Sequence, residues 1–198
     1  MPGVRLMLVA PVLLVVVACG SGGGGGGGAT APPTDPSPSV PGPPPVATPP
    51  VDPTPVGGVV PQGFDTTPAR VTTVDGEVCD LCVWVADDNA RRGRGLMGVT
   101  DLGGLDGMAF VYDEPRTTSF TMRNTLLPLT IVFYGPDGRY LDAFDMEPCE
   151  AEPCPPYPTP EGFTVAVEVL QGEHAGLAMV QGSVLELLTG DCETPPSH

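Results

Sequence analysis

The sequence holds one distinctive polar cluster, residues 122–125 (Met-Arg-Asn-Thr), which lies between two apolar segments and has Arg94 upstream. An arginine can bind an anionic group through two parallel hydrogen bonds, while amide and hydroxyl groups orient the bound molecule. Arg94, Arg123, Asn124 and Thr125 are therefore the candidate ligand-binding residues. The alternative is that Asn124 and Thr125 hydrogen bond the backbone of their own loop while Arg123 pairs with a surface acid.

Groups suited to catalysis are few. The two histidines are His174 and His198, the last residue, so a Ser–His or Cys–His nucleophile has almost no candidate. The 24 acidic residues show no spacing that singles out an acid–base pair. Five methionines with His174 would suit copper(I), but three of them lie in apolar segments typical of core packing. We therefore assign no catalytic residue, metal ligand or cofactor.

Cys79 and Cys82 form a C-x-x-C pair, a spacing typical of redox and metal sites. They lie in an apolar segment that favours a strand, where residues i and i+3 are on opposite faces and about 10 Å apart. A disulfide needs Cα atoms within about 7 Å, so these two cysteines pair only if a turn interrupts the strand. No second C-x-x-C completes a zinc site. An enzyme or thiol-redox protein, using this pair or a groove near Arg94 and Arg123, remains the alternative function.

The charge of the chain argues against nucleic acid as a partner. The formal net charge is −16, with 24 acidic and 8 basic residues, and every basic residue is arginine. A chain this acidic repels phosphate backbones.

The first nineteen residues predict export and lipidation. Arg5 precedes an apolar run, residues 6–18, that is too short to span a bilayer and is typical of a signal peptide. The run ends in Ala18-Cys19, which resembles the lipobox of bacterial lipoproteins. That resemblance implies cleavage after residue 18 and attachment of lipid to Cys19. We therefore expect residues 1–18 to be a signal peptide and the protein to be anchored at the extracytoplasmic face of the bacterial cell membrane.

Residues 19–69 are expected to form a disordered tether. Gly22–Gly28 is an unbroken run of glycine, and residues 32–61 are rich in proline. Glycine favours a flexible coil and proline an extended polyproline II conformation, and neither segment can bury enough apolar surface to fold. The tether would hold a globular domain, residues 70–193, away from the membrane, with residues 194–198 as a tail.

An exported location favours disulfides among the remaining cysteines. We expect Cys149–Cys154 to close a proline-rich loop and Cys192 to bond either Cys79 or Cys82. One thiol is then left over, which would suit pairing between molecules.

The domain reads as short strands with little helix. Phe163, Val165, Val167 and Val169 alternate with Thr164, Ala166 and Glu168, which indicates a half-buried strand. Gly135-Pro-Asp-Gly138 is a turn signal between two apolar segments and predicts a hairpin. The expected strands are residues 78–85, 108–112, 117–122, 129–134, 139–144, 163–169 and 183–188, and the expected helices are a short one capped within Asp87-Asp88-Asn89 and one over 173–180. The fold class is therefore α+β and mostly β, a compact, barrel-like sheet, antiparallel or mixed, with two short helices.

Several short motifs occur in an order and spacing that resemble the bacterial and archaeal family called domain of unknown function 192. They are Arg94-Gly-Leu-Met97, Gly107-Met-Ala-Phe110, Phe120-Thr-Met-Arg-Asn-Thr125, Pro128-Leu129, Phe133, Asp137-Gly138 and Val167-Glu168-Val169. The resemblance covers about residues 78–188 and implies a compact β-rich fold, often secreted or membrane-anchored, with no established activity. The family usually has Asp where Thr130 and Ser183 stand here, so the resemblance implies no shared carboxylate chemistry at these positions.

Together these observations predict a membrane-anchored extracytoplasmic lipoprotein with a small β-rich domain. We expect the domain to be a non-enzymatic module that binds a small ligand or an envelope protein.

Overall fold

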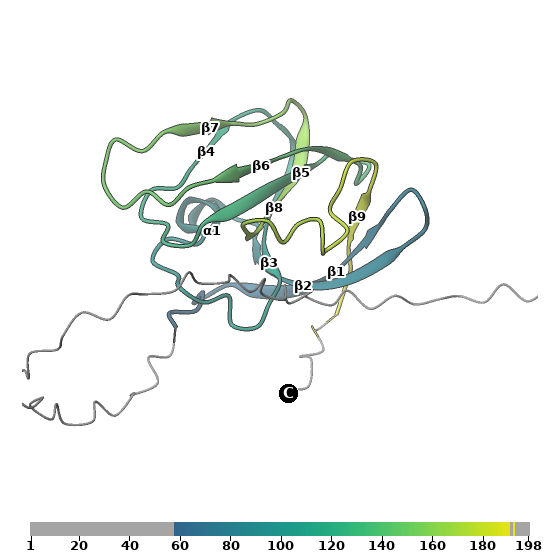
Figure 1. The fold of residues 1–198 in the computed structure, drawn as a ribbon, viewed down its shortest axis with the longest axis horizontal. Coiled ribbons are helices and arrows are strands. Elements are labelled where there is room, and N and C mark those ends of the chain that lie inside the picture. Colours follow the sequence, from purple (N-terminus) through teal and green to yellow (C-terminus); the bar gives the residue numbers. More distant parts are fainter. Residues whose placement is uncertain (1–57, 191, 193–198) are drawn as a thin grey trace, which may run out of the picture. The chain divides into compact units, whose positions relative to one another are not determined.

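The structure is a computed structural model, and it describes residues 58–190 and residue 192 (Figure 1). The expected signal peptide, Cys19, most of the expected tether and the tail at 194–198 lie outside the described residues. Within the described residues, no helix is long and apolar enough to cross a membrane.

The described residues form a mostly β fold built on a mixed seven-stranded sheet, which confirms the predicted fold class. The strand order is β6-β5-β8-β3-β2-β1-β9, and a separate two-stranded sheet pairs β4 with β7. All neighbouring strands are antiparallel except the pair β2 and β3. The elements are β1 (Asp65–Thr72), β2 (Val78–Ala86), α1 (Asn89–Arg94), β3 (Gly107–Arg116), β4 (Ser119–Thr121), β5 (Leu129–Tyr134), β6 (Tyr140–Met146), β7 (Pro156–Pro158), β8 (Phe163–Leu170) and β9 (Val184–Leu187).

The short helix α1 lies in the crossover between the parallel strands β2 and β3. Its N-cap is Asp88, whose side chain accepts a hydrogen bond from the Arg91 backbone N–H at 2.8 Å. The helix stops at Gly95, whose φ of 47° is disfavoured for residues with a side chain. The predicted short helix is thus confirmed.

The predicted hairpin is also confirmed, with β5 and β6 joined by a turn at residues 135–139. The Gly135 N–H donates to the Arg139 carbonyl oxygen at 2.9 Å, and Gly138 has a φ of 73°. A Cβ at Gly138 would collide with the Leu185 carbonyl oxygen of β9. This glycine therefore supplies both the turn and the close approach of the hairpin to β9.

Both faces of the large sheet are covered by apolar side chains. On one face, which we call the pocket side, β3 and β5 contribute Met108, Phe110, Ile131 and Phe133, each at most 3% exposed. The opposite face holds a second cluster that includes Val71, Leu81, Val132, Tyr134 and Val167. The small sheet packs on the pocket side through Phe120 of β4, whose ring lies 5.9 Å from that of Phe133.

Three expectations about the fold are wrong. The sheet is not closed into a barrel, because β6 and β9 are its two edges and meet only at the isolated bridge between Arg139 and Val184. The segment 173–180 is a series of turns, since Ala178 has a φ of 59° and Gly176 adds flexibility. The strand expected over 117–122 is limited to Ser119–Thr121, where β4 pairs with β7 outside the large sheet.

Strand β1 was not predicted. It begins at Asp65, within the segment assigned to the tether, and pairs with β2 on one side and β9 on the other. Pro68 interrupts its apolar pattern, and only Ala69 and Val71 are buried. Strand β2 follows β1 directly in the chain, whereas the pairing of β1 with β9 depends on residues far along the chain.

The disulfides settle the alternatives left open by the cysteine spacing. Cys149 bonds Cys154, as predicted, and Cys192 bonds Cys82, with Cα atoms 5.8 and 5.7 Å apart. Strand β2 runs without interruption through Cys79 and Cys82, so these two face opposite ways and do not bond each other. No cysteine in the described part of the chain is a free thiol, and the expected leftover thiol is therefore not found there.

Candidate functional site

A pocket of about 250 Å³ opens on the pocket side of the sheet. Its wall is made by α1 and the residues after it, by β3, by β4 with the loop that follows, and by one residue of β8. Segments that are distant in sequence therefore build the pocket, and Figure 1 labels the elements to which they belong. The residues fall into three groups: a buried polar end, aromatic walls and an exposed arginine mouth.

Glu168 forms the buried end of the pocket. It lies in the middle of β8, opposite Met108 of β3 and Ile131 of β5, and is only 6% exposed. No other described residue forms a hydrogen bond or ion pair with its carboxyl group. Burial among apolar side chains disfavours the charged carboxylate and raises the pKa of Glu168 to about 8.

Thr125 is a second buried polar group without a partner. It is 5% exposed and lines the same pocket, and its hydroxyl forms no hydrogen bond with the described residues. Its position is set by the backbone, since its N–H donates to the Met122 carbonyl oxygen at 2.9 Å. A bound molecule could hydrogen bond both this hydroxyl and the Glu168 carboxyl.

Aromatic rings form the walls of the pocket. Phe110 and Tyr112 come from β3 and Phe120 from β4, and the rings of Phe110 and Phe120 meet edge to face at 5.2 Å. The Arg92 guanidinium lies 4.7 Å from the centre of the Tyr112 ring. Burial raises the pKa of Tyr112, so its phenol stays protonated at neutral pH.

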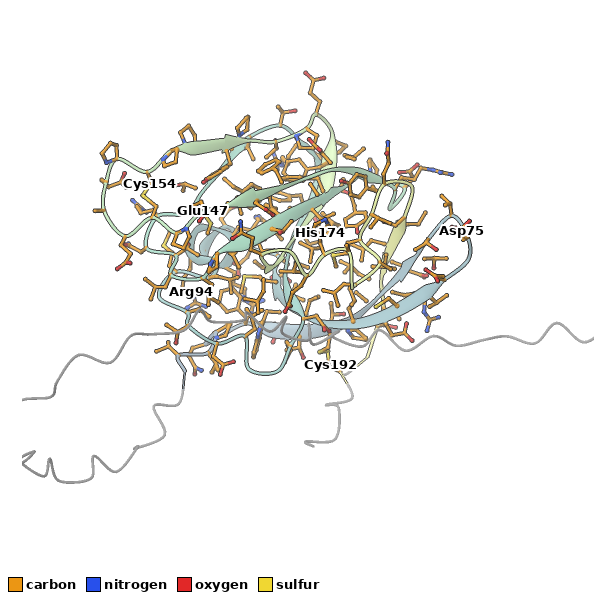
Figure 2. The ribbon with its side chains drawn as sticks, viewed as in Figure 1. Asp75, Arg94, Glu147, Cys154, His174 and Cys192 are labelled. Atoms are coloured by element: carbon orange, nitrogen blue, oxygen red, sulfur yellow. A yellow bond between two sulfur atoms is a disulfide. The ribbon has the colours of Figure 1, made fainter. Side chains whose placement is uncertain are left out.

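Two exposed arginines stand at the mouth of the pocket. Arg94, the last residue of α1 and labelled in Figure 2, stacks 4.3 Å from the centre of the Phe64 ring and donates to the Gln62 carbonyl oxygen. Arg123 is 55% exposed, and its nearest acid is Glu152, with 4.0 Å between Nε and the carboxylate oxygen. Both guanidinium groups therefore keep donors free for an anionic ligand.

Three of the four predicted ligand-binding residues line this pocket: Arg94, Arg123 and Thr125. Asn124 does not. It has a φ of 55°, and its backbone bonds Cys149 and Gly98, so it shapes the loop that carries its neighbours. The alternative stated for Asn124 is a side-chain hydrogen bond to its own loop, but the bonds that it forms among the described residues are made by its backbone.

Sequence reasoning missed Glu168. The alternation along residues 163–169 placed it on the polar face of a half-buried strand, but both faces of the sheet are covered. The signal that could have found it is a single charged residue within an otherwise apolar strand, in a family motif.

The other polar candidates lie elsewhere. Thr130 donates to Asp145 at 2.6 Å and accepts from the Gly172 N–H at 3.0 Å, away from the pocket lining. His174, labelled in Figure 2, is also absent from the pocket lining. Among residues 58–190 and 192, no group of three or more His, Cys, Asp or Glu is arranged to hold a metal ion.

The fold and the site define a small, mostly β domain with one carboxyl group buried at the end of an arginine-rimmed pocket. The family model DUF192, described as Uncharacterized ACR, matches residues 70–187, and the chain belongs to this family. The predicted family membership is thus confirmed.

Two solved structures resemble the chain. One is a protein of unknown function from Novosphingobium aromaticivorans, 29% identical, with a TM-score of 0.57 over 66% of this chain and 92% of that chain. The other is a putative transcription regulator from Sinorhizobium meliloti, 28% identical, with a TM-score of 0.54 over 63% of this chain and 95% of that chain. No functionally curated protein matches the chain.

Proposed function

We propose that this protein is a lipoprotein held at the extracytoplasmic face of the bacterial cell membrane, whose domain binds a small ligand in the Glu168 pocket. The anchor is proposed from the Ala18-Cys19 motif after an apolar run. Disulfides at Cys82–Cys192 and Cys149–Cys154 support an oxidising compartment, where such bonds persist.

The observation that carries the binding role is the unpartnered carboxyl of Glu168. The fully buried side-chain polar atoms without a partner are Tyr134 Oη, His174 Nδ1 and Ser183 Oγ, among the described residues, and the Glu168 carboxyl is not one of them. It therefore keeps access to the pocket and can bond a molecule that enters it. Here the group faces a pocket that also presents the free hydroxyl of Thr125 and two arginines. A ligand that enters the pocket could hydrogen bond all of these groups at once.

The binding role can be tested with the full chain purified in mild detergent. We would screen small carboxylates, phosphates, sugars and amino acids by thermal shift and measure binders by calorimetry. Arg123→Ala and Glu168→Leu should each weaken a binder at least tenfold. Arg139→Ala, which removes an exposed arginine beside Asp137 and outside the pocket lining, is the matched control and should leave binding unchanged.

Two results would contradict the binding role. One is a binder whose affinity is the same in Arg123→Ala and Glu168→Leu, with both variants shown by circular dichroism to be folded. The other is a screen in which no compound binds the full chain.

A second candidate function is acid–base catalysis by Glu168. It is favoured by the raised pKa of this carboxyl, because a group that titrates near neutral pH can both accept and return a proton. In that case a bound compound would be chemically changed on incubation, as followed by NMR, and Glu168→Gln would abolish the change while the compound still binds.

The thiol-redox alternative has no support from the cysteine pair. Cys82 is bonded to Cys192, and Cys79 lies on the other face of β2. We also propose no nucleic-acid partner, because the net charge of −16 opposes binding to phosphate backbones.

A further inference from the structure

The pocket's geometry points to a class of ligand: an anionic polyol of single-ring size. Its anionic group binds Arg94 and Arg123 at the mouth, and its hydroxyl groups bind Glu168 and Thr125 at the buried end. This inference rests on the proposed binding function and adds the chemistry of the ligand.

The mouth of the pocket selects a negative charge. Arg123 is more than half exposed and forms one long ion pair, with Glu152 at 4.0 Å through its Nε, and Arg94 uses one donor on Gln62. A third arginine of the lining, Arg92, is occupied, because it donates to the Asp87 and Val111 carbonyl oxygens, each at 2.6 Å. Arg94 and Arg123 are therefore the residues that can bind a carboxylate or phosphate.

The buried end selects hydroxyl groups. With a pKa of about 8, Glu168 is neutral at pH 7, so its carboxyl both donates and accepts a hydrogen bond. The Thr125 hydroxyl can likewise donate and accept a hydrogen bond. Ligand hydroxyls also donate and accept, so they can satisfy both groups. A neutral Glu168 does not repel an anionic ligand, as an ionised one would.

The surroundings of Glu168 hold no other acid that could replace this role. Tyr112 of β3 lies close to Glu168, and Arg92, Arg94 and Arg123 line the same pocket. Its partners across β3 and β5 are Met108 and Ile131, which are apolar. Glu168 is thus the single carboxyl group in the described pocket lining.

The size and walls of the pocket favour one ring. A volume of about 250 Å³ lies just below the usual range for small-molecule pockets, roughly 300–1,000 Å³. Phe110, Tyr112 and Phe120 supply flat apolar surface beside it. The carbon skeleton of a sugar ring would pack on these rings while its hydroxyls point to the buried end.

Other ligand classes fit less well. An apolar anion would satisfy the arginines but would cover Glu168 and Thr125 without giving them hydrogen-bond partners, which is unfavourable. A neutral sugar would satisfy the buried end but leave the arginines without an anion.

Four compounds separate these classes by calorimetry on the full chain in mild detergent. D-glucuronate carries a carboxylate and hydroxyls, D-glucose 6-phosphate a phosphate and hydroxyls, D-glucose only hydroxyls, and cyclohexanecarboxylate only the charge. We expect at least one of the two anionic sugars to bind at least tenfold more tightly than both of the others. The comparison of glucuronate with glucose 6-phosphate tells carboxylate from phosphate at the mouth.

Two variants test the assigned contacts. Arg123→Ala should lower the affinity of the anionic sugar at least tenfold and leave that of glucose unchanged. Glu168→Gln, which keeps one donor and one acceptor, should retain binding within about threefold, whereas Glu168→Leu should lose at least tenfold. Thermal melts confirm that each variant is folded.

The inference is overturned if cyclohexanecarboxylate or glucose binds as tightly as the anionic sugars, or if neither anionic sugar binds. If another compound then binds and depends on Arg123 and Glu168, the class is wrong but the binding function stands. If binders are found and none depends on these residues, the binding function itself fails.

Discussion

The Glu168 carboxyl and the Thr125 hydroxyl line one pocket from different parts of the chain, and neither has a hydrogen-bond partner among the described residues. Glu168 is held by the middle of β8, between β3 and β5. Thr125 is held by a loop whose backbone bonds the segments at Met97 and Cys149. Both groups are thus positioned by rigid backbone, and their unmet hydrogen bonds are the basis of the proposed binding role.

The buried carboxyl should make stability fall as pH rises. The pKa of Glu168 is about 8 in the folded protein and near 4.5 when exposed, so between these values the folded state keeps a proton that the unfolded state has lost. Each pH unit in this window should then lower the free energy of unfolding by about 1.4 kcal/mol. Urea unfolding should be measured from pH 5 to 8 for the unmodified protein and for Glu168→Gln. The fall in the free energy of unfolding per pH unit should be smaller by this amount in Glu168→Gln.

The control for this experiment is Glu186→Gln, which changes an exposed glutamate on β9. It should leave the slope as it is in the native protein. Equal slopes for native protein and Glu168→Gln would show that Glu168 ionises normally in the fold.

Replacing Glu168 by leucine should stabilise the domain. Leucine removes a carboxyl group that lies among apolar side chains, and burying such a polar group costs about 1–3 kcal/mol. We expect urea unfolding at pH 7 to show a gain of about 2 kcal/mol in the free energy of unfolding. Glu186→Leu should change it by no more than about 0.5 kcal/mol. A loss of stability in Glu168→Leu would mean that the carboxyl has a structural partner.

The two disulfides should differ in their effect on stability. Cys82 and Cys192 are 110 residues apart in sequence, and Cys149 and Cys154 are 5 apart. A disulfide that closes a longer loop removes more entropy from the unfolded chain. The resulting stabilisation is roughly 4.7 kcal/mol for a loop of about 100 residues and roughly 3 kcal/mol for one of about 15. The double variant Cys82→Ser/Cys192→Ser should therefore lose more free energy of unfolding than Cys149→Ser/Cys154→Ser. The reverse order would show that the long crosslink contributes little.

The turn glycine Gly138 should tolerate no side chain. Its φ of 73° and the nearby Leu185 carbonyl both oppose a Cβ. Gly162 has a similar φ of 75° but open space around it, so Gly162→Ala isolates the cost of the backbone conformation. We expect Gly162→Ala to cost about 1 kcal/mol and Gly138→Ala clearly more, by chemical denaturation. Equal losses would mean that the hairpin shifts away from β9 at no cost.

Cys19→Ser should release the protein from the membrane. The proposed anchor is lipid on the Cys19 sulfur, and serine cannot carry the thioether. Cell fractionation should find the native protein with membranes and the variant in the soluble extracytoplasmic fraction, and mass spectrometry of the native protein should show an acylated N-terminus at residue 19. An unmodified native protein that still carries residues 1–18 would contradict the anchor.

The sequence by itself determined the features that depend on residues close together in the chain. The turn at Gly135–Gly138, the Asp88 cap of α1 and the pairing of Cys149 with Cys154 follow from residues close together in the chain, and each is present. The family motifs predicted the family correctly, and the spacing of Cys79 and Cys82 correctly predicted that they do not bond each other in an uninterrupted strand.

Only the tertiary structure decided what depends on distant contacts. Strand β1 lies between β2, which follows it in the chain, and β9, which is distant in sequence. The sheet stays open because its edge strands meet at a single bridge, between Arg139 and Val184. Alternation along β8 could not show that both faces of the sheet are covered, so the burial of Glu168 was invisible. Its altered ionisation and its place in the pocket follow from that burial, since the surrounding apolar side chains come from other strands.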